Sequence, residues 1–213
     1  MGSSGSGKTT LLYSLSGMDR ASLGKVIFNA KEIQSLTNEK LAKFRRENCG
    51  FVFQSIYLLE NMSVLDNVLA AGLLKKQNKA ELVARAKKLL ESVGINEALW
   101  TKFPNQLSGG ERQRAGIIRA VINSPKILFA DEPTGALDSS AGRDVLDVMT
   151  KLNSEGQTVI MVTHDIKSAI RAQRIIYLRD GRTDGELTLS AYTEKETASR
   201  IKMVTGFLDE MGW

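Results

Sequence analysis

A glycine-rich loop at the start of the chain restricts the possible folds more than any other feature. Residues 2–9 read GSSGSGKT and match the phosphate-binding pattern G-x-x-x-x-G-K-[ST]. Such a loop joins a strand to a helix, and the segment from Thr9 to Gly17 has the apolar positions and the glycine stop of that helix. The leading strand would have to precede Met1. The loop therefore predicts an α/β fold that binds a nucleotide phosphate.

Composition excludes several other classes of protein. The 213 residues suffice for the core of one domain, and no apolar run approaches the roughly 18–20 residues that cross a bilayer. The N-terminus does not resemble a secretory leader, and the single cysteine, Cys49, excludes an internal disulfide and fits a reducing cytoplasm. The net charge is +5, but the basic residues are scattered and the densest run is residues 43–46. We therefore expect a solvated basic surface and no nucleic-acid partner.

Strand-like runs alternate with helical patterns along the chain, which predicts an α/β fold with a mostly parallel sheet covered by helices. The runs are residues 25–28, 50–53, 127–130, 158–162 and 174–178. The third and fourth are unbroken apolar stretches, typical of central strands buried on both faces. Between residues 55 and 105 the apolar spacing becomes helical, which predicts an inserted helical subdomain.

The loop chemistry assigns a role to each of its side chains. Successive backbone N–H groups and the following helix N-terminus form a cradle for an anion. Lys8 would reach the β- and γ-phosphates, and the Thr9 hydroxyl would ligate Mg²⁺. A glycine/serine leader added for expression is the alternative, but it would not continue into a lysine, two threonines and two leucines. The predicted nucleotide-binding residues are Gly2, Ser3, Ser4, Gly5, Ser6, Gly7, Lys8, Thr9 and Thr10.

Two further groups of residues carry chemistry. Asp131 and Glu132 directly follow an apolar strand, at the strand end where α/β folds bind ligands. Asp131 is suited to hold Mg²⁺ and Glu132 to act as general base toward water. Ser108, Gly109 and Gly110 open a helix with a hydroxyl and bare N–H groups, which is a second anion site. Two such sites in one chain suggest that each loop meets its complement in another copy.

Together these motifs resemble those of the ABC ATPases. Residues 107–111 (LSGGE) are similar to the signature motif, and Gln54 resembles the glutamine of the Q-loop. Residues 131–133 resemble the Walker B box with its catalytic glutamate, 136–138 the D-loop, and 163–165 the loop of the switch histidine. The motifs occur in the family's order and spacing from Gly2 to about Leu189, which makes the resemblance very specific.

The resemblance implies an ATPase that powers a membrane permease from the cytoplasmic face of the membrane. Two copies would enclose two ATP molecules, each with Mg²⁺, as a homodimer. It implies that Lys8, Thr9, Asp131 and Gln54 hold Mg-ATP, that Glu132 and His164 support attack by water, and that Ser108, Gly109, Gly110 and Asp138 complete the partner's site. On this basis Glu132→Gln should keep ATP binding and lose turnover.

The resemblance also divides the chain. It implies one ABC ATPase domain over residues 1–213, with a catalytic core at 1–54 and 106–190, a helical subdomain at 55–105 and a C-terminal helix at 191–213. Residues 56–59 lie where the family receives its permease. The sequences around 129–138 and 177–181 are similar to the subgroup that drives lipoprotein release, macrolide export and antimicrobial-peptide resistance.

The chain departs from the family's pattern ahead of the loop. The family has a β-region there, with an aromatic that stacks on adenine and the strand that enters the loop; a misassigned start codon or a truncation would explain the difference. Without that strand, the sheet should present two open pairing edges. Two alternatives stay open: a soluble ABC-type ATPase that acts on nucleic acid or ribosomes, and an inactive nucleotide-binding fragment.

Overall fold

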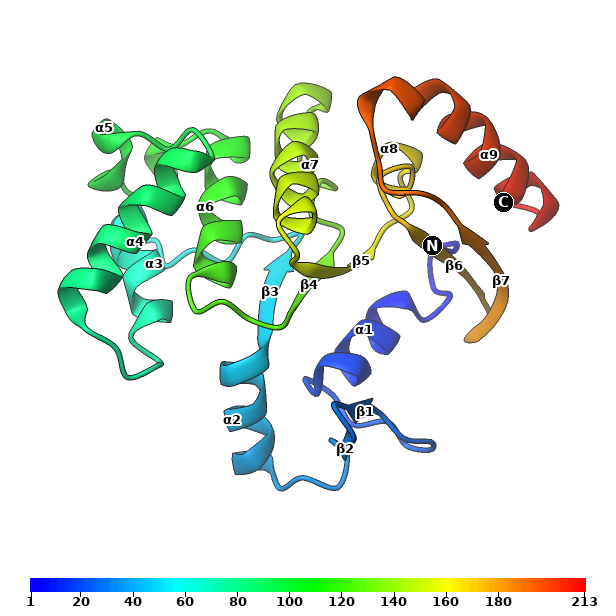
Figure 1. Ribbon diagram of the computed structural model, residues 1–213, viewed down its shortest axis with the longest axis horizontal. Helices are drawn as coiled ribbons and strands as arrows, with labels where there is room; N and C mark the ends of the chain where they lie inside the picture. Colours follow the sequence, from blue (N-terminus) through cyan, green and yellow to red (C-terminus); the bar gives the residue numbers. More distant parts are fainter.

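A three-stranded parallel sheet forms the centre of the computed structural model, which describes residues 1–213 (Figure 1). The strands β3 (Cys49–Phe53), β4 (Ile127–Asp131) and β5 (Thr158–Val162) lie in the order β3-β4-β5. Their register places Phe53 opposite Asp131, and Asp131 opposite Val162. The predicted parallel sheet is confirmed, and the carboxyl ends of all three strands meet at one edge.

Helices cover both faces of this sheet, because alternate residues of a buried strand point to opposite sides. Helix α1 (Lys8–Ser16) packs on β4 and β5, where Leu12 contacts a small apolar cluster with Phe129. Helices α6 (Gly109–Val121) and α7 (Ser139–Ser154) cover the other face, over Leu128 and its neighbours. Figure 1 shows α1 on the opposite side of the strands from α6 and α7.

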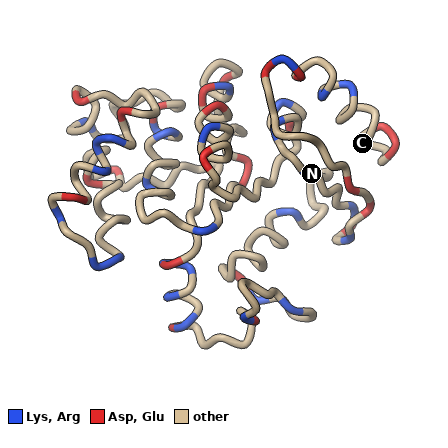
Figure 2. The backbone as a smooth tube through the Cα atoms, in the orientation of Figure 1, with Lys and Arg blue, Asp and Glu red and all other residues tan.

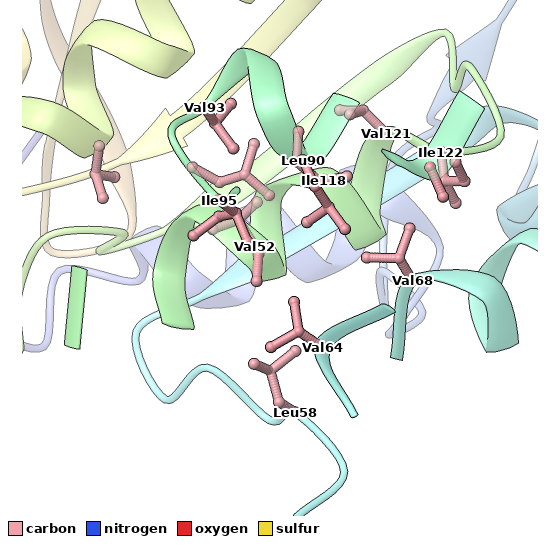
Figure 3. Close-up of a cluster of buried hydrophobic side chains, with 14 of the residues drawn as sticks. Val52, Leu58, Val64, Val68, Leu90, Val93, Ile95, Ile118, Val121 and Ile122 are labelled. Atoms are coloured by element: carbon pink, nitrogen blue, oxygen red, sulfur yellow. The ribbon is translucent and has the colours of Figure 1, made fainter. Parts of the chain in front are cut away.

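The predicted helical segment consists of four short elements. They are α3 (Val64–Gly72), α4 (Lys79–Ser92), α5 (Glu97–Trp100) and the 3₁₀ helix η1 (Pro104–Gln106). Their apolar faces join α6 and the central sheet in one cluster of 20 buried residues, part of which Figure 3 shows. This cluster fixes the helical segment against the helix that follows it in the chain.

Two of the predicted strands lie outside the parallel sheet. Residues 25–28 contribute only β1 (Ile27–Phe28), which pairs antiparallel with β2 (Lys31–Glu32) before helix α2 (Asn38–Asn48). The 174–178 run becomes β6 (Arg174–Arg179), which pairs antiparallel with β7 (Arg182–Thr188). The turn between them uses Asp180 and Gly181, both with positive φ. The sequence prediction missed β7 because its polar residues lack an apolar alternation.

The prediction that β5 is buried on both faces was wrong. It is the last strand of the three-stranded sheet, and Val159, Ile160 and Met161 are only half-buried. A groove of about 710 Å³ lies beside it, lined by β5, β6, α1 and α7. Met1 enters this groove and pairs with β6: its amino group donates to the Ile176 carbonyl at 2.7 Å, and Leu178 N–H donates to its carbonyl at 2.8 Å. The parallel sheet therefore ends at β5, whereas the facing side of β6 pairs with Met1.

The C-terminal segment forms η2 (Glu194–Glu196) and α9 (Thr197–Glu210), which packs on α8 (Ile166–Ala169). Ile201 on α9 is 41% exposed. Arg200 is buried instead and donates to the carbonyls of Ile170 and Ala172. These bonds satisfy the guanidinium in an apolar surrounding and dock the helix. None of the helices has the length and apolar character that a bilayer crossing requires.

Candidate functional site

The carboxyl edge of the parallel sheet gathers four of the predicted residues. Gln54 follows β3, Asp131 ends β4 and Glu132 follows it, and His164 comes two residues after β5. Because the register sets Phe53, Asp131 and Val162 side by side, the residues after them start from adjacent positions. The edge of an open parallel sheet is where α/β proteins bind their ligands.

Thr9 and Asp131 lie in contact at this edge. The Thr9 hydroxyl donates to Oδ1 of Asp131 at 3.1 Å, although the two residues are 122 positions apart. Tyr13, one turn further along α1, also approaches the carboxylate: burial raises the pKa of its phenol, and Asp131 raises it further. Hydroxyl and carboxylate oxygens are the ligands that Mg²⁺ takes, with waters and phosphate oxygens completing its octahedron. The pair therefore fits one side of a magnesium site.

The phosphate loop is folded as a cradle for an anion. Gly5 and Gly7 have φ values of 79° and 92°, which turn successive N–H groups inward. The Ser6 hydroxyl is buried and has no hydrogen-bond partner, so it is available to a ligand. Lys8 is buried, and its ammonium donates to the Ser3 carbonyl at 2.7 Å. Buried donors without an acidic partner make a site for an anion, and a nucleotide phosphate fits them.

The turn between β6 and β7 holds the loop in place. Gly181 N–H donates to the Ser6 carbonyl at 3.1 Å. A Cβ on Gly2 would lie 2.2 Å from the Leu178 carbonyl oxygen, so only glycine allows this approach. The sequence contained a signal for this contact, since the glycine at 181 follows an aspartate in a turn pattern, but the partner could not be read from it.

Glu132 and His164 form a hydrogen-bonded pair. His164 Nδ1 lies 2.7 Å from Oε1 of Glu132. A carboxylate oxygen only accepts, so Nδ1 donates, and Nε2 is left to accept in the neutral ring or to donate in the protonated ring. Glu132 has a φ of 47°, a left-handed conformation that costs an ordinary residue about 1–3 kcal/mol. The Val162 carbonyl accepts its N–H at 3.0 Å and helps hold it there.

Gln54 lies over the turn that follows Glu132. A Cβ on Gly135 would come within 2.9 Å of the Gln54 side-chain nitrogen. The glycine therefore lets the exposed glutamine side chain lie flat against the turn. This contact connects the ends of β3 and β4 at the same edge.

The second predicted anion site lies apart from the first. Ser108 caps α6: its hydroxyl accepts from Glu111 N–H at 3.3 Å, and the Glu111 carboxylate accepts from Ser108 N–H at 2.7 Å. This bond holds the pKa of Glu111 below its usual value. Because α6 and α1 pack on opposite faces of the sheet, one chain does not bring Gly109 and Gly110 to the phosphate loop.

The glycines of this second site also serve packing. A Cβ on Gly110 would lie 2.9 Å from the Cβ of Ala141 on α7, so the two helices approach closely at this point. The helix that Gly110 approaches, α7, begins at Ser139. Asp138, and not Ser139, caps α7 by accepting from the N–H groups of Ser140 and Ala141, and these bonds lower the pKa of its carboxyl group.

Two side chains near the site were given no role from the sequence. Gln113 on α6 is 1% exposed, and its amide reaches both Phe53 and Pro133. Thr163 is buried between β5 and His164, and its hydroxyl accepts from Asp165 N–H at 2.9 Å. A polar residue on the apolar side of α6 was the only signal for Gln113. Sequence alone does not show which carbonyls it meets.

Comparison with known proteins shows which family this chain resembles. The family profile described as "ABC transporter" matches residues 1–135. The uncharacterized ABC transporter ATP-binding protein MJ1508 of Methanocaldococcus jannaschii is 45% identical over 85% of this chain and 80% of its own length. The macrolide export ATP-binding/permease protein MacB of Aggregatibacter actinomycetemcomitans is 39% identical over the whole chain, which spans 32% of that relative.

A solved structure shows the same fold. The ATP-binding cassette MJ0796, in a dimeric post-hydrolysis state bound to ADP and Pi, matches with a TM-score of 0.81 and 39% identity. The match covers 90% of this chain and 84% of that one. The chain spans about a third of the length of the MacB relatives and most of the length of the single-cassette relatives.

Proposed function

Because the chain belongs to the ABC transporter family and is an ATPase of that family, we propose that it is the cytoplasmic motor of a membrane permease. The strand register is the main support for the proposed site. It sets the residues after Phe53, Asp131 and Val162 side by side at the carboxyl edge of the parallel sheet. Thr9 bonded to Asp131, and His164 bonded to Glu132, belong to the same edge. The helical subdomain at residues 55–105 and the two-part catalytic core remain part of this proposal.

In the proposed reaction, the loop binds the phosphates and the strand ends act on water. Lys8 would leave the Ser3 carbonyl and neutralise the β- and γ-phosphates. Thr9 and Asp131, with Gln54, would hold Mg²⁺, which neutralises charge on the phosphate oxygens when bound. Glu132 would accept a proton from the attacking water, and His164 would hold the Glu132 carboxylate through its Nδ1.

We propose that the working unit is a homodimer. Ser108 to Gly110 and Asp138 lie away from the loop of their own chain, so they would complete the site of a second copy. Trans-complementation tests this arrangement. Lys8→Ala and Ser108→Arg should each abolish ATP hydrolysis, and a mixture of the two proteins should regain part of it. One of the two sites in a mixed dimer has an intact loop and an intact Ser108. A mixture without activity would contradict the arrangement.

The proposed permease contact is an apolar surface on the helical segment. Tyr57, Leu59, Met62 and Phe103 are 67%, 50%, 37% and 43% exposed. The Val64 N–H donates to the Lys102 carbonyl at 2.9 Å, which brings the two stretches together. Exposed apolar groups of this kind mark interaction sites. The chain would then lie on the inner face of the membrane as a peripheral subunit.

The transported class is inferred from the relatives alone. Because MacB-type proteins named for macrolide export are among them, we propose an export or resistance system for macrolides, antimicrobial peptides or lipoproteins. Lys and Arg are interleaved with Asp and Glu along the chain (Figure 2).

Co-purification with a co-expressed permease tests the proposed permease contact. The double variant Tyr57→Glu with Leu59→Glu should no longer retain the permease, and retention by the double variant would contradict this surface.

A further inference from the structure

Gln113 connects three parts of the site that the strand register alone does not connect. It lies on α6, five residues after Ser108, and is 1% exposed. Its side-chain nitrogen donates to the Phe53 carbonyl at 3.1 Å and to the Pro133 carbonyl at 2.7 Å. Phe53 directly precedes Gln54, and Pro133 directly follows Glu132. One amide group therefore bridges the two backbone segments that carry these side chains.

A second side chain of the same helix supports the bridge. Arg119 donates to the carbonyls of Ile56 and Tyr57, the first at 2.9 Å. Helix α6 thus holds the segment after β3 at both ends, through Gln113 at Phe53 and Arg119 at residues 56 and 57. Gly116, between them on α6, allows Ile56 to approach, since a Cβ there would lie 3.2 Å from its methyl group. The segment that carries Gln54 is therefore tied to α6 through three of its carbonyls.

The two hydrogen bonds of Gln113 can set the distance between the Phe53 and Pro133 carbonyls. Both amide hydrogens are used, so the distance between the two carbonyls is fixed by the width of one –NH₂ group. The bond to Pro133 is buried and the bond to Phe53 is partly buried, so removing the donor takes a hydrogen bond from two shielded carbonyls. The Gln113 carbonyl oxygen has no partner, so the side chain is held by its donors alone.

We propose that Gln113 is a positioning residue of the ATPase: its amide sets the separation of Gln54 from Glu132 and ties both to the helix that begins at Ser108. The inference rests on the proposed roles of Gln54 and Glu132. Because Ser108 would face the nucleotide of a second copy, the bridge provides a path by which closure of that interface aligns the Glu132 backbone.

The first test is Gln113→Met, which keeps the volume and removes both donors. We expect kcat to fall by about 10–100-fold, the range for a small misplacement of reacting groups. The KM for ATP should change by less than about threefold, because the loop residues stay in place. The matched control is Gln157→Met. Gln157 donates to the carbonyls of Lys126 and Thr158 at the opposite edge of the sheet, and its loss should leave kcat unchanged.

The second test is Gln113→Glu, which keeps the shape of the side chain and supplies a separate readout if Gln113→Met does not fold. A carboxylate would face two carbonyls, whereas the protonated acid can donate to one of them. Burial favours the protonated form, so the activity relative to the wild type at the same pH should rise as pH falls from 8 to 6. A purely structural role would leave this ratio flat over the pH range in which circular dichroism shows both proteins fully folded.

The outcomes separate the inference from the function on which it rests. Hydrolysis that persists in Glu132→Gln would refute the proposed roles of the site. If Glu132→Gln loses hydrolysis, two results would overturn the positioning role alone. One is a wild-type kcat in Gln113→Met, and the other is an equal loss of kcat in the Gln113 and Gln157 variants. In a double-mutant cycle, Gln54→Ala should lower kcat less in the Gln113→Met background than in the wild type, and full additivity would also overturn it.

Discussion

Replacing Gly110 with alanine should separate packing from anion binding at the start of α6. The added Cβ would lie 2.9 Å from the Ala141 Cβ, which is fixed on α7 and cannot rotate away. The matched control is Gly109→Ala, whose Cβ would lie 3.1 Å from a terminal methyl of Leu137. Leu137 precedes α7, and its methyl group can turn aside. The first substitution therefore forces two helices apart, and the second does not.

The structure gives the size of this difference. Overpacking of a closed core costs about 1–3 kcal/mol, and alanine in place of a helical glycine returns up to about 1 kcal/mol. Gly110→Ala should therefore lose about 1–2 kcal/mol of unfolding free energy, and Gly109→Ala should be neutral or slightly more stable. For a chain of this length, the melting temperature of Gly110→Ala should fall by about 2–8 °C.

The assay is urea unfolding followed by far-UV circular dichroism, without nucleotide, so that anion binding does not contribute. The reasoning would be refuted if the two alanine variants had the same midpoint, or if Gly109→Ala were the less stable one. A control of wild-type protein at two concentrations shows whether self-association affects the midpoint.

Three other predictions concern stability and reactivity. Gly50→Ala should destabilise the fold by about 1–3 kcal/mol in urea unfolding, because its Cβ would lie 2.5 Å from the Ala120 carbonyl oxygen; an unchanged midpoint would contradict this packing. Burial raises the pKa of Cys49 to about 12, so iodoacetamide at pH 8 should react slowly until the chain is unfolded in urea, and equal rates would disprove burial. The Ser108 N–H lowers the pKa of Glu111. The wild type should therefore be more stable than Glu111→Gln at pH 7, and this advantage should be lost as pH falls through the lowered pKa. An advantage that persists at pH 2 would rule out this cause.

Much of the fold could be predicted from local patterns. The helix after the phosphate loop, the helical segment and the strand before Asp131 each show a periodicity that matches their burial. These elements bury enough apolar surface for the pattern to be regular. The apolar run of β5 also predicted a strand, but not its place at the edge of the sheet. Pairing partners depend on the whole topology, which a run of apolar residues does not specify.

The site could be predicted as residues but not as contacts. The motifs indicated Lys8, Asp131, Glu132 and His164, and the structure brings the last three to the strand ends. The Lys8 bond to its own loop was not foreseeable, because the lysine finds an acceptor only once the loop is folded. The bridge made by Gln113 was invisible for a similar reason. Its partners are backbone carbonyls, which carry no sequence signal.

The measurement that tests the account most directly compares ATP binding and turnover in Glu132→Gln. The site predicts that the dissociation constant for Mg-ATP stays within about threefold of the wild type, because the substitution keeps the shape and leaves the loop untouched. Turnover should fall by about 10²–10⁴-fold, the contribution of a general base. Retained binding with lost turnover would support Glu132 as the group that activates water. Turnover equal to that of the wild type would contradict the account.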